Sequence, residues 1–271
     1  MGDTVLDGGA NQGIYTLSFG KKVGKHGKVI SFEPFEYCVS QIKYNSKINN
    51  LSNIKIIKKC LYNKNTNLSI DYTDGIGSAS ITKNLGNLKK KVKTITIDKT
   101  KKNLKLNKIK LIKLDIEGAE LDALIGAKRV LKTDKPIVSV ECEPKEFIKI
   151  NKFMSKYGYN PYLLNNDGFL IKITRIINKE PCVIFVNDNM KFKLNFIKKK
   201  IIDKYMEVFI LCGGYGTRLD HQSKLIAKPM VRIGKEPIIY YIMENFANQR
   251  LNNFVLCLGH KKETIINYFL K

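Results

Sequence analysis

An apolar segment that runs directly into a glycine-rich turn occurs twice in this chain. The first copy, at the start, reads TVLDGGANQG, and the second, from Met206, reads MEVFILCGGYGTRL. In α/β proteins such a segment is a buried strand, and the turn leads into a helix whose free N–H groups face a ligand. Two such beginnings predict two α/β units, each with its own ligand-facing turn.

The boundary between the two units is expected at Met206. Residues 188–205 before it are basic and amphipathic, and we interpret them as a linker. This predicts a first domain over residues 1–187 and a second over residues 206–271. Because one sequence pattern replaces another there, the two parts are expected to pack as separate bodies with few shared contacts.

The first domain alternates between predicted strands and helices. Strands are expected over Thr4–Leu6, Lys28–Phe32, Ile54–Leu61, Lys110–Leu114 and Ile137–Glu141. Helices are expected over Gly13–Lys22, Glu36–Ile48 and Ala119–Leu131. Such alternation is typical of a mostly parallel sheet covered by helices.

Two segments of the first domain depart from this alternation. Tyr62–Asp98 combines turn residues with β-branched alternation, which predicts an antiparallel insertion. Tyr162–Leu164 and Phe169–Ile173, joined through Asn166-Asp167-Gly168, predict a hairpin at one edge of the sheet. A mostly parallel sheet finished by antiparallel strands is a mixed α/β architecture.

The composition excludes several classes of protein. Hydrophobic residues make up 44% and charged residues 27%, as in globular domains, so wholesale disorder is not expected. No run approaches the roughly 18 apolar residues of a spanning helix, and the start lacks a secretory leader, which predicts a cytoplasmic protein. The scattered cysteines and histidines have no metal-ligand spacing, so neither a structural zinc site nor a disulfide framework is expected.

The net charge of +24 raises nucleic acid as an alternative partner. Nearly all of the positive charge is lysine, whereas arginine is the usual residue for bidentate phosphate and base contacts. The lysine blocks therefore favour a solvated surface, and nucleic acid is disfavoured as a partner.

Acidic residues surround the first glycine turn, which runs from Asp7 to Gly13. Asp7 closes the strand, and a carboxylate there suits a ligand with an ammonium group better than one with a pyrophosphate. Glu33 ends the next strand, where an acid can accept hydrogen bonds from ribose hydroxyls. Asp115 and Glu117 follow the strand Lys110–Leu114 and are expected in the same cleft, at the carboxyl edge of the sheet.

Three ordered motifs, GDTVLDGGANQGIYTL, VISFEP and LIKLDIEGAELDALIGA, resemble the FkbM-type methyltransferases over about residues 1–187. The resemblance implies a class I methyltransferase fold of Rossmann type. It also implies methylation of a hydroxyl group with S-adenosylmethionine as cofactor. The expected cofactor-binding residues are Asp7, Gly9, Asn11, Gly13 and Glu33. Family members carry helical sequence ahead of this strand, so a domain shortened at its N-terminus is expected.

The acids after the strand Lys110–Leu114 are the catalytic candidates. Methyl transfer from a sulfonium is an in-line displacement, in which positioning supplies most of the catalysis. An alcohol acceptor must also lose its proton, and Asp115 or Glu117 is the expected base. The alternative is that one of them only caps the helix that begins near Ala119. No metal is assigned to this site.

The second glycine turn has the features of a triphosphate site. Loop N–H groups can surround phosphate oxygens, and Arg218 and Lys228 supply positive charge. The alternative is a glycine loop with two surface cations. The segment resembles sugar-1-phosphate nucleotidyltransferases, glucose-1-phosphate cytidylyltransferase above all, on VRIGKEPIIYYIMENF and NNFVLCLGHKKETIINYF. This implies nucleotide binding at Gly213, Gly214, Gly216, Thr217, Arg218 and Lys228.

The second resemblance covers only residues 206–271, enough for a β-α-β-α start. The metal-binding acids of that family lie outside this stretch, so Mg²⁺ is expected only for a complete enzyme and the second part is expected to be inactive. The sequence thus predicts an O-methyltransferase of surface-polysaccharide biosynthesis joined to a partial α/β unit. Its expected partners are a sugar or glycan acceptor and, at the second part, a nucleoside triphosphate. The alternatives are a nucleotidyltransferase fragment and an inactive fusion of two truncated enzymes.

Overall fold

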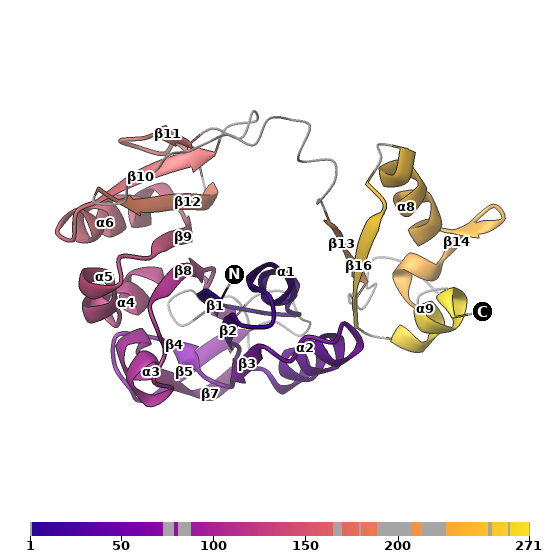
Figure 1. Ribbon diagram of the computed structural model, residues 1–271, viewed down its shortest axis with the longest axis horizontal. Coiled ribbons are helices and arrows are strands. Elements are labelled where there is room, and N and C mark those ends of the chain that lie inside the picture. The colour runs from indigo at the N-terminus through magenta and orange to yellow at the C-terminus, as the bar shows by residue number, and fades with distance from the viewer. Residues whose placement is uncertain are drawn as a thin grey trace. The chain divides into compact units, whose positions relative to one another are not determined.

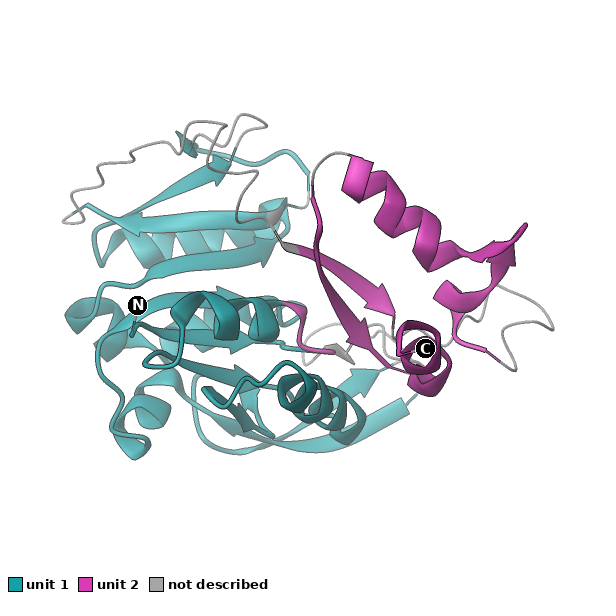
Figure 2. Ribbon diagram, turned by 45° about the vertical axis from the view of Figure 1, so that its right-hand side comes forward, with its two compact units in different colours: residues 1–11, 15–194 teal, residues 12–14, 195–271 magenta. Residues whose placement is uncertain are grey.

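The computed structural model describes residues 2–72, 79–80, 88–164, 170–178, 180–188, 207–212, 226–248, 251–259 and 261–270. The chain divides into two compact units, which Figure 2 colours separately. The first comprises residues 1–11 and 15–194, and the second residues 12–14 and 195–271. Among the described helices, none is both long and apolar enough to cross a lipid bilayer.

The first unit is built on an eight-stranded sheet. Its strands are β1 (Thr4–Gly8), β2 (Lys28–Phe32), β3 (Ile54–Ile57), β8 (Ile109–Leu114), β9 (Ile137–Cys142), β10 (Tyr159–Leu164), β11 (Leu170–Lys172) and β12 (Glu180–Asn187). They lie in the order β11-β10-β12-β9-β8-β1-β2-β3. The five strands from β9 to β3 are parallel to one another, and β12, β10 and β11 continue the sheet in antiparallel fashion. The predicted mixed α/β architecture is confirmed, and β10 with β11 forms the predicted edge hairpin, whose residues 165–169 lie outside the described residues.

Successive side chains of β1 point to opposite faces of this sheet. Leu6 belongs to the large core shared with α4 (Glu120–Ile125), α5 (Lys128–Thr133) and α6 (Pro144–Ser155). Val5 belongs to a smaller core beside α1 (Ile14–Val23), whose other members are Phe19, Val23, Val29, Ile54 and Leu111. In Figure 1, α1 and the group α4–α6 lie on opposite sides of the sheet. Asp7, two residues beyond Val5, therefore points toward α1.

Strand β1 lies where the winding of the chain reverses. From β1 the chain builds outward through β2 and β3, and it then returns to place β8 and β9 on the other side of β1. In open α/β sheets, ligands bind beyond the carboxyl ends of the strands at such a switch point. The ends of β1 and β8, at Gly8 and Leu114, thus mark the expected site.

The single strand predicted over Ile54–Leu61 is wrong, because the structure has two strands there. The first, β3, joins the main sheet, whereas β4 (Cys60–Leu61) joins a four-stranded sheet of order β4-β7-β5-β6. The N–H of Lys59 donates to the carbonyl of Ile57 at 2.8 Å, and this tight turn redirects the chain. The predicted antiparallel insertion is otherwise confirmed by the pairing of β5 (Asn67–Tyr72) with β7 (Leu88–Ile95) and β6 (Ala79–Ser80).

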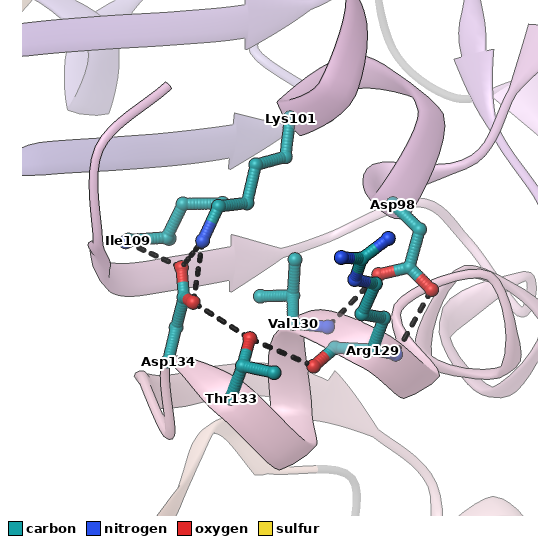
Figure 3. A network of polar contacts seen from close by, with 7 residues as sticks. All are labelled: Asp98, Lys101, Ile109, Arg129, Val130, Thr133 and Asp134. Atoms are coloured by element: carbon teal, nitrogen blue, oxygen red, sulfur yellow. Dashed lines mark hydrogen bonds and ion pairs between the residues drawn. The ribbon is translucent and has the colours of Figure 1, made fainter. Parts of the chain in front are cut away.

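The single helix predicted over Ala119–Leu131 is also wrong, because α4 and α5 are separate helices. Gly126 lies at the break, where a Cβ atom would come within 2.3 Å of the carbonyl oxygen of Tyr62. The carbonyl of Gly126 accepts from the N–H of Asp98 at 3.0 Å. The carboxylate of Asp98 in turn accepts from the N–H groups of Arg129 and Val130, both at 2.9 Å, at the start of α5 (Figure 3). The chain breaks here because a neighbouring segment caps the second helix.

Among the helices of the described residues, α3 (Ile97–Asn103) and α6 lie outside the predicted elements, while the predicted α2 (Glu36–Ile48) is confirmed. A polar network ties α3 to α5 and to the start of β8 (Figure 3). The Asp134 carboxylate accepts from Lys101 at 2.5 Å, from the Thr133 hydroxyl at 2.8 Å and from the N–H of Ile109 at 2.8 Å. One buried carboxylate therefore fixes where β8 begins.

The second unit contains a two-stranded parallel sheet of β13 (Glu207–Cys212) and β16 (Asn253–Leu258). Between them lie the 3-10 helix η2 (Lys228–Met230), a short antiparallel pair β14 (Arg232–Ile233) and β15 (Glu236–Pro237), and the helix α8 (Ile238–Asn248). Helix α9 (Lys262–Phe269) follows. The expected β-α-β-α start is confirmed by β13, α8, β16 and α9.

Candidate active site

The glycine turn after β1 is bonded to both neighbouring strands. The N–H groups of Gly9 and Ala10 donate to the carbonyl of Phe32 at 3.2 and 3.1 Å, and the N–H of Asp115 donates to the carbonyl of Gly8 at 3.2 Å. Gly9 has a φ of 76°, and a Cβ atom there would lie 1.8 Å from the carbonyl oxygen of Asp115. Only glycine permits this contact between the turn and the end of β8.

Glu33 lies directly after β2 and is almost completely buried. Its two carboxylate oxygens accept from the N–H of Asn11 at 2.8 Å and from the N–H of Phe35 at 2.9 Å. Asn11 and Gly13 both have positive φ values, of 49° and 92°. Burial raises the pKa of Glu33 to about 7, although these N–H groups act in the opposite direction. The predicted residues Asn11 and Glu33 are thus in direct contact.

Asp7 lies beneath the glycine turn with none of its surface exposed. One carboxylate oxygen accepts from the hydroxyl of Thr16 on α1 at 2.6 Å, and the other lies 3.7 Å from the ammonium of Lys113. Burial raises the pKa of Asp7, whereas Lys113 and Thr16 lower it. The carboxylate therefore faces α1, and none of it is exposed in this structure.

Lys113 is a member of this group that the motifs do not single out. It lies on β8 opposite Asp7 in the parallel register, and 7% of the residue is exposed. Its ammonium donates to a carboxylate oxygen of Asp115 at 3.3 Å and lies 4.6 Å from the centre of the Tyr15 ring. A lysine inside the apolar run LIKL, two residues before an acid, is the sequence signal that marks it.

Three carboxylates gather at the ends of β8 and β9. One oxygen each from Asp115, Glu117 and Glu141 lies within 4.8 Å of the others. The side chain of Asp115 is 40% exposed, and Glu117 has a left-handed φ of 52°. Carboxylates this close can share a proton or bind a divalent cation. Glu141 extends the predicted pair of catalytic candidates to three acids.

The turn ahead of α4 is stabilised by Glu120, another acid outside the predicted site. Its carboxylate oxygens accept from the N–H groups of Ile116 and Gly118, both at 2.8 Å. Burial raises the pKa of Glu120 to about 7, against these two hydrogen bonds. Glu120, in the first turn of α4, thus accepts hydrogen bonds from free backbone N–H groups ahead of the helix. This is the capping role that the sequence suggested as the alternative for Asp115 or Glu117.

Of the predicted nucleotide-binding residues of the second unit, Lys228 lies among the described residues. Gly213, Gly214, Gly216, Thr217 and Arg218 lie outside the described residues, whereas Lys228 is exposed at the start of η2. Glu236 accepts from the hydroxyl of Tyr268 at 2.8 Å. Over residues 207–212, 226–248, 251–259 and 261–270, no three acidic, histidine or cysteine side chains are close enough to share a metal ion.

Residues 7–161, more than half of the chain, match the family model described as the methyltransferase FkbM domain. The chain belongs to the FkbM methyltransferase family. The match includes the glycine turn, Glu33 and the acids from Asp115 to Glu141. The mixed sheet is thus the class I methyltransferase fold predicted from the sequence. A solved FkbM methyltransferase from Methylobacillus flagellatus is 16% identical, with a TM-score of 0.46 over 68% of this chain and 43% of that one.

Residues 207–271 match the family model of the nucleotidyl transferases. The probable glucose-1-phosphate cytidylyltransferase of Bacillus subtilis is 45% identical over 65 residues, which cover 24% of this chain and 26% of the relative. The glucose-1-phosphate cytidylyltransferase of Salmonella typhimurium is 42% identical over 69 residues, 24% of this chain and 27% of the relative. The chain thus spans about a quarter of the length of these curated relatives. It joins an FkbM domain to a segment similar to part of a nucleotidyltransferase.

Proposed function

We propose that the FkbM domain transfers a methyl group from S-adenosylmethionine to a hydroxyl group of a sugar in surface-polysaccharide biosynthesis. The observation that carries the proposal is the switch point between β1 and β8. There the glycine turn and Asp115 are in backbone contact, and Glu33 lies beside the turn. One edge of the sheet thus combines a glycine turn, whose backbone is open to a ligand, with two carboxylates. A small ligand with ammonium and ribose groups requires such a combination.

The residues present fit this cofactor. Glycine at position 9 lets the turn pack against the end of β8, where a Cβ atom would strike the carbonyl of Asp115. We propose that the backbone of this turn, from Gly9 to Gly13, faces the cofactor. Each carboxylate oxygen of Glu33 accepts one backbone N–H, which leaves further lone pairs for ribose hydroxyls. Asp7 supports the turn from below through Thr16 and Lys113. When bound, the cofactor supplies the electrophilic methyl group.

Asp115 is the proposed base, with Glu117 as the second candidate. The Asp115 carboxylate is partly exposed at the end of β8, and its hydrogen bond from Lys113 fixes its direction. An acceptor hydroxyl that donates a hydrogen bond to this carboxylate would pass its proton to it as the hydroxyl oxygen is methylated. Glu117 and Glu141 add negative charge near the same position. Most of the rate enhancement would come from positioning of acceptor and donor.

For the second unit we propose nucleotide contacts at Lys228 and at the turn 213–218. The similarity of this unit to glucose-1-phosphate cytidylyltransferases supports a sugar as the acceptor of the first. Nucleotidyl transfer requires a divalent metal held by acidic ligands. Glu236 and Glu244 accept from tyrosine hydroxyls, and Glu263 is exposed on α9. We therefore propose that the 271-residue chain alone does not transfer nucleotides.

A transfer assay tests the acceptor class. The chain is incubated with S-adenosylmethionine labelled in its methyl group and with a panel of free sugars, sugar phosphates and nucleoside-diphosphate sugars. We expect label in an alkali-stable methyl ether of a sugar. Label in nucleic acid or protein, with none in any sugar of the panel, would contradict the proposed acceptor.

A further inference from the structure

Lys113 links the two halves of the proposed methyltransferase site. Its ammonium lies 3.7 Å from a carboxylate oxygen of Asp7, under the glycine turn, and 3.3 Å from a carboxylate oxygen of Asp115, at the end of β8. The ring of Tyr15 on α1 covers the ammonium, with its centre 4.6 Å away. One cation thus pairs with Asp7, which lies beneath the turn, and with Asp115, the candidate base.

Packing alone does not account for a lysine at this position. Leu111, two residues earlier on the same face of β8, packs with the small apolar core beside α1. An apolar residue at 113 would continue that core, whereas an ion pair withdrawn from water loses much of its solvation. The lysine instead allows two carboxylates to lie close to one switch point.

Lys113 offsets only part of the negative charge of this cluster. Asp7 and Asp115 each bring a carboxylate, and Lys113 lies between them with a single positive charge. Without the ammonium, no positive charge would offset the repulsion between the carboxylates of Asp7 and Asp115. Because the turn also contacts the backbone of Asp115, a displacement of either group would move the other.

We propose that Lys113 is a positioning residue of the methyl-donor site, which holds Asp115 and the glycine turn in register and sets the net charge presented to the donor. This inference rests on the proposed function. S-adenosylmethionine carries a sulfonium cation, whereas its product S-adenosylhomocysteine has a neutral sulfur. The charge of Lys113 therefore affects the affinity for the donor more than the affinity for the product.

The experiment compares calorimetric affinities for S-adenosylmethionine and S-adenosylhomocysteine. Removal of Lys113 alone would leave Asp7 buried without its cation, which favours unfolding or proton uptake. The central pair is therefore Asp7→Asn and Asp7→Asn with Lys113→Met, because these two proteins differ only in the lysine. Lys113→Arg in the otherwise natural chain is the control that keeps the charge.

We expect the preference for S-adenosylmethionine over its product to rise roughly threefold to tenfold when Lys113→Met is added, as loss of one nearby cation predicts. Lys113→Arg should keep the preference of the natural chain. A purely structural lysine would change both affinities by the same factor, and an unchanged ratio would overturn the inference. If the natural chain bound neither ligand, the proposed function itself would fall, and the inference with it. Should the double variant with Lys113→Met not fold, Lys113→Gln in the same Asp7→Asn background makes the same comparison, and an unchanged ratio there overturns the inference equally.

Discussion

Asp7 and Lys113 lie opposite each other in the parallel register of β1 and β8, with their charged groups 3.7 Å apart and almost no surface exposed. This buried pair lies directly under the glycine turn that closes β1. It connects the turn to Asp115 and hence to the acidic end of β8.

Replacement of Glu33 by glutamine should weaken the binding of S-adenosylhomocysteine by about 1.5–3 kcal/mol, the contribution of hydrogen bonds to a charged acceptor. The pKa of Glu33 is raised to about 7, and the ionised form is the better acceptor for ribose hydroxyls. Affinity in the natural chain should therefore fall as the pH drops through about 7. This pH dependence should vanish in Glu33→Gln.

The control for Glu33 is Glu36→Gln, an exposed acid on α2 that pairs with Lys58. Calorimetric titrations at several pH values should give natural affinity for Glu36→Gln throughout. Equal affinities of Glu33→Gln and Glu36→Gln for S-adenosylhomocysteine would contradict the assignment of Glu33 to the cofactor site.

Gly9→Ala should abolish cofactor binding, because the new Cβ atom would lie 1.8 Å from the carbonyl oxygen of Asp115. Gly158→Ala is the matched control, since Gly158 has a similar φ of 74° but its nearest atom to a Cβ lies 3.6 Å away. Both variants should lose about 1–2 kcal/mol of stability from the left-handed backbone alone. Only Gly9→Ala should also lose binding in a thermal-shift titration. Retained binding in Gly9→Ala would show that the cofactor does not approach this turn.

Asp115→Asn should lower the rate of methyl transfer by roughly 10²–10⁴-fold, as loss of a general base does. The affinity for S-adenosylhomocysteine should change little, because the amide still accepts from Lys113. Glu117→Gln is the comparison, and the acid whose loss reduces kcat more is the base. Rates are measured with labelled donor and the sugar acceptor that the transfer assay identifies. Full activity in both variants would exclude a carboxylate base from this pair.

Asp134→Asn should destabilise the fold, since Asp134 joins α3, α5 and the start of β8 (Figure 3). Burial opposes ionisation of Asp134, but the N–H of Ile109, the ammonium of Lys101 and the hydroxyl of Thr133 together hold its pKa below the usual value of an aspartate. A lowered pKa stabilises the fold above the unfolded value, and this contribution is lost as the pH falls through the folded value. The natural chain should therefore lose stability below about pH 4, and Asp134→Asn should lose less over that range.

Urea unfolding at pH 3 to 7 measures this effect, with the exposed Asp3→Asn as control. We expect Asp134→Asn to cost about 1–3 kcal/mol at pH 7, because buried donors lose a charged acceptor. The same pH slope in Asp134→Asn and the natural chain would contradict the role given to this carboxylate.

The second unit should form no CDP-glucose from CTP, glucose 1-phosphate and Mg²⁺. The reason is the separation of its described acids, because Glu236, Glu244 and Glu263 do not form a cluster. Chromatography of the reaction mixture at high enzyme concentration checks this. Detectable product would mean that acids outside the described residues complete a metal site.

The sequence predicted those parts of the fold that depend on local pattern. The bounds of β2 and α2 agree with the expectation, because apolar spacing and flanking turns are local signals. The split between α4 and α5 could not be predicted, because it depends on the approach of Gly126 to the distant Tyr62. Helix α6 had a readable start, since Glu143 and Glu146 form a capping box around Pro144.

The contacts within the candidate site were predictable to the same extent. Asn11 and Glu33 follow strand ends, and strand ends meet at one edge of a parallel sheet. Lys113 escaped because lysine is abundant throughout this chain, so its place inside the apolar run LIKL was too weak a signal to separate it from the exposed lysines. Glu141 belongs to a different strand, so only the pairing of β8 with β9 brings it to Asp115 and Glu117.

Titration of S-adenosylhomocysteine into the 271-residue chain by calorimetry tests the central claim most directly. The account predicts saturable binding of one molecule per chain, lost in Gly9→Ala and retained in Gly158→Ala. No heat of binding to a chain that is shown to be folded, or equal binding to both glycine variants, would contradict a cofactor site at the ends of β1 and β8.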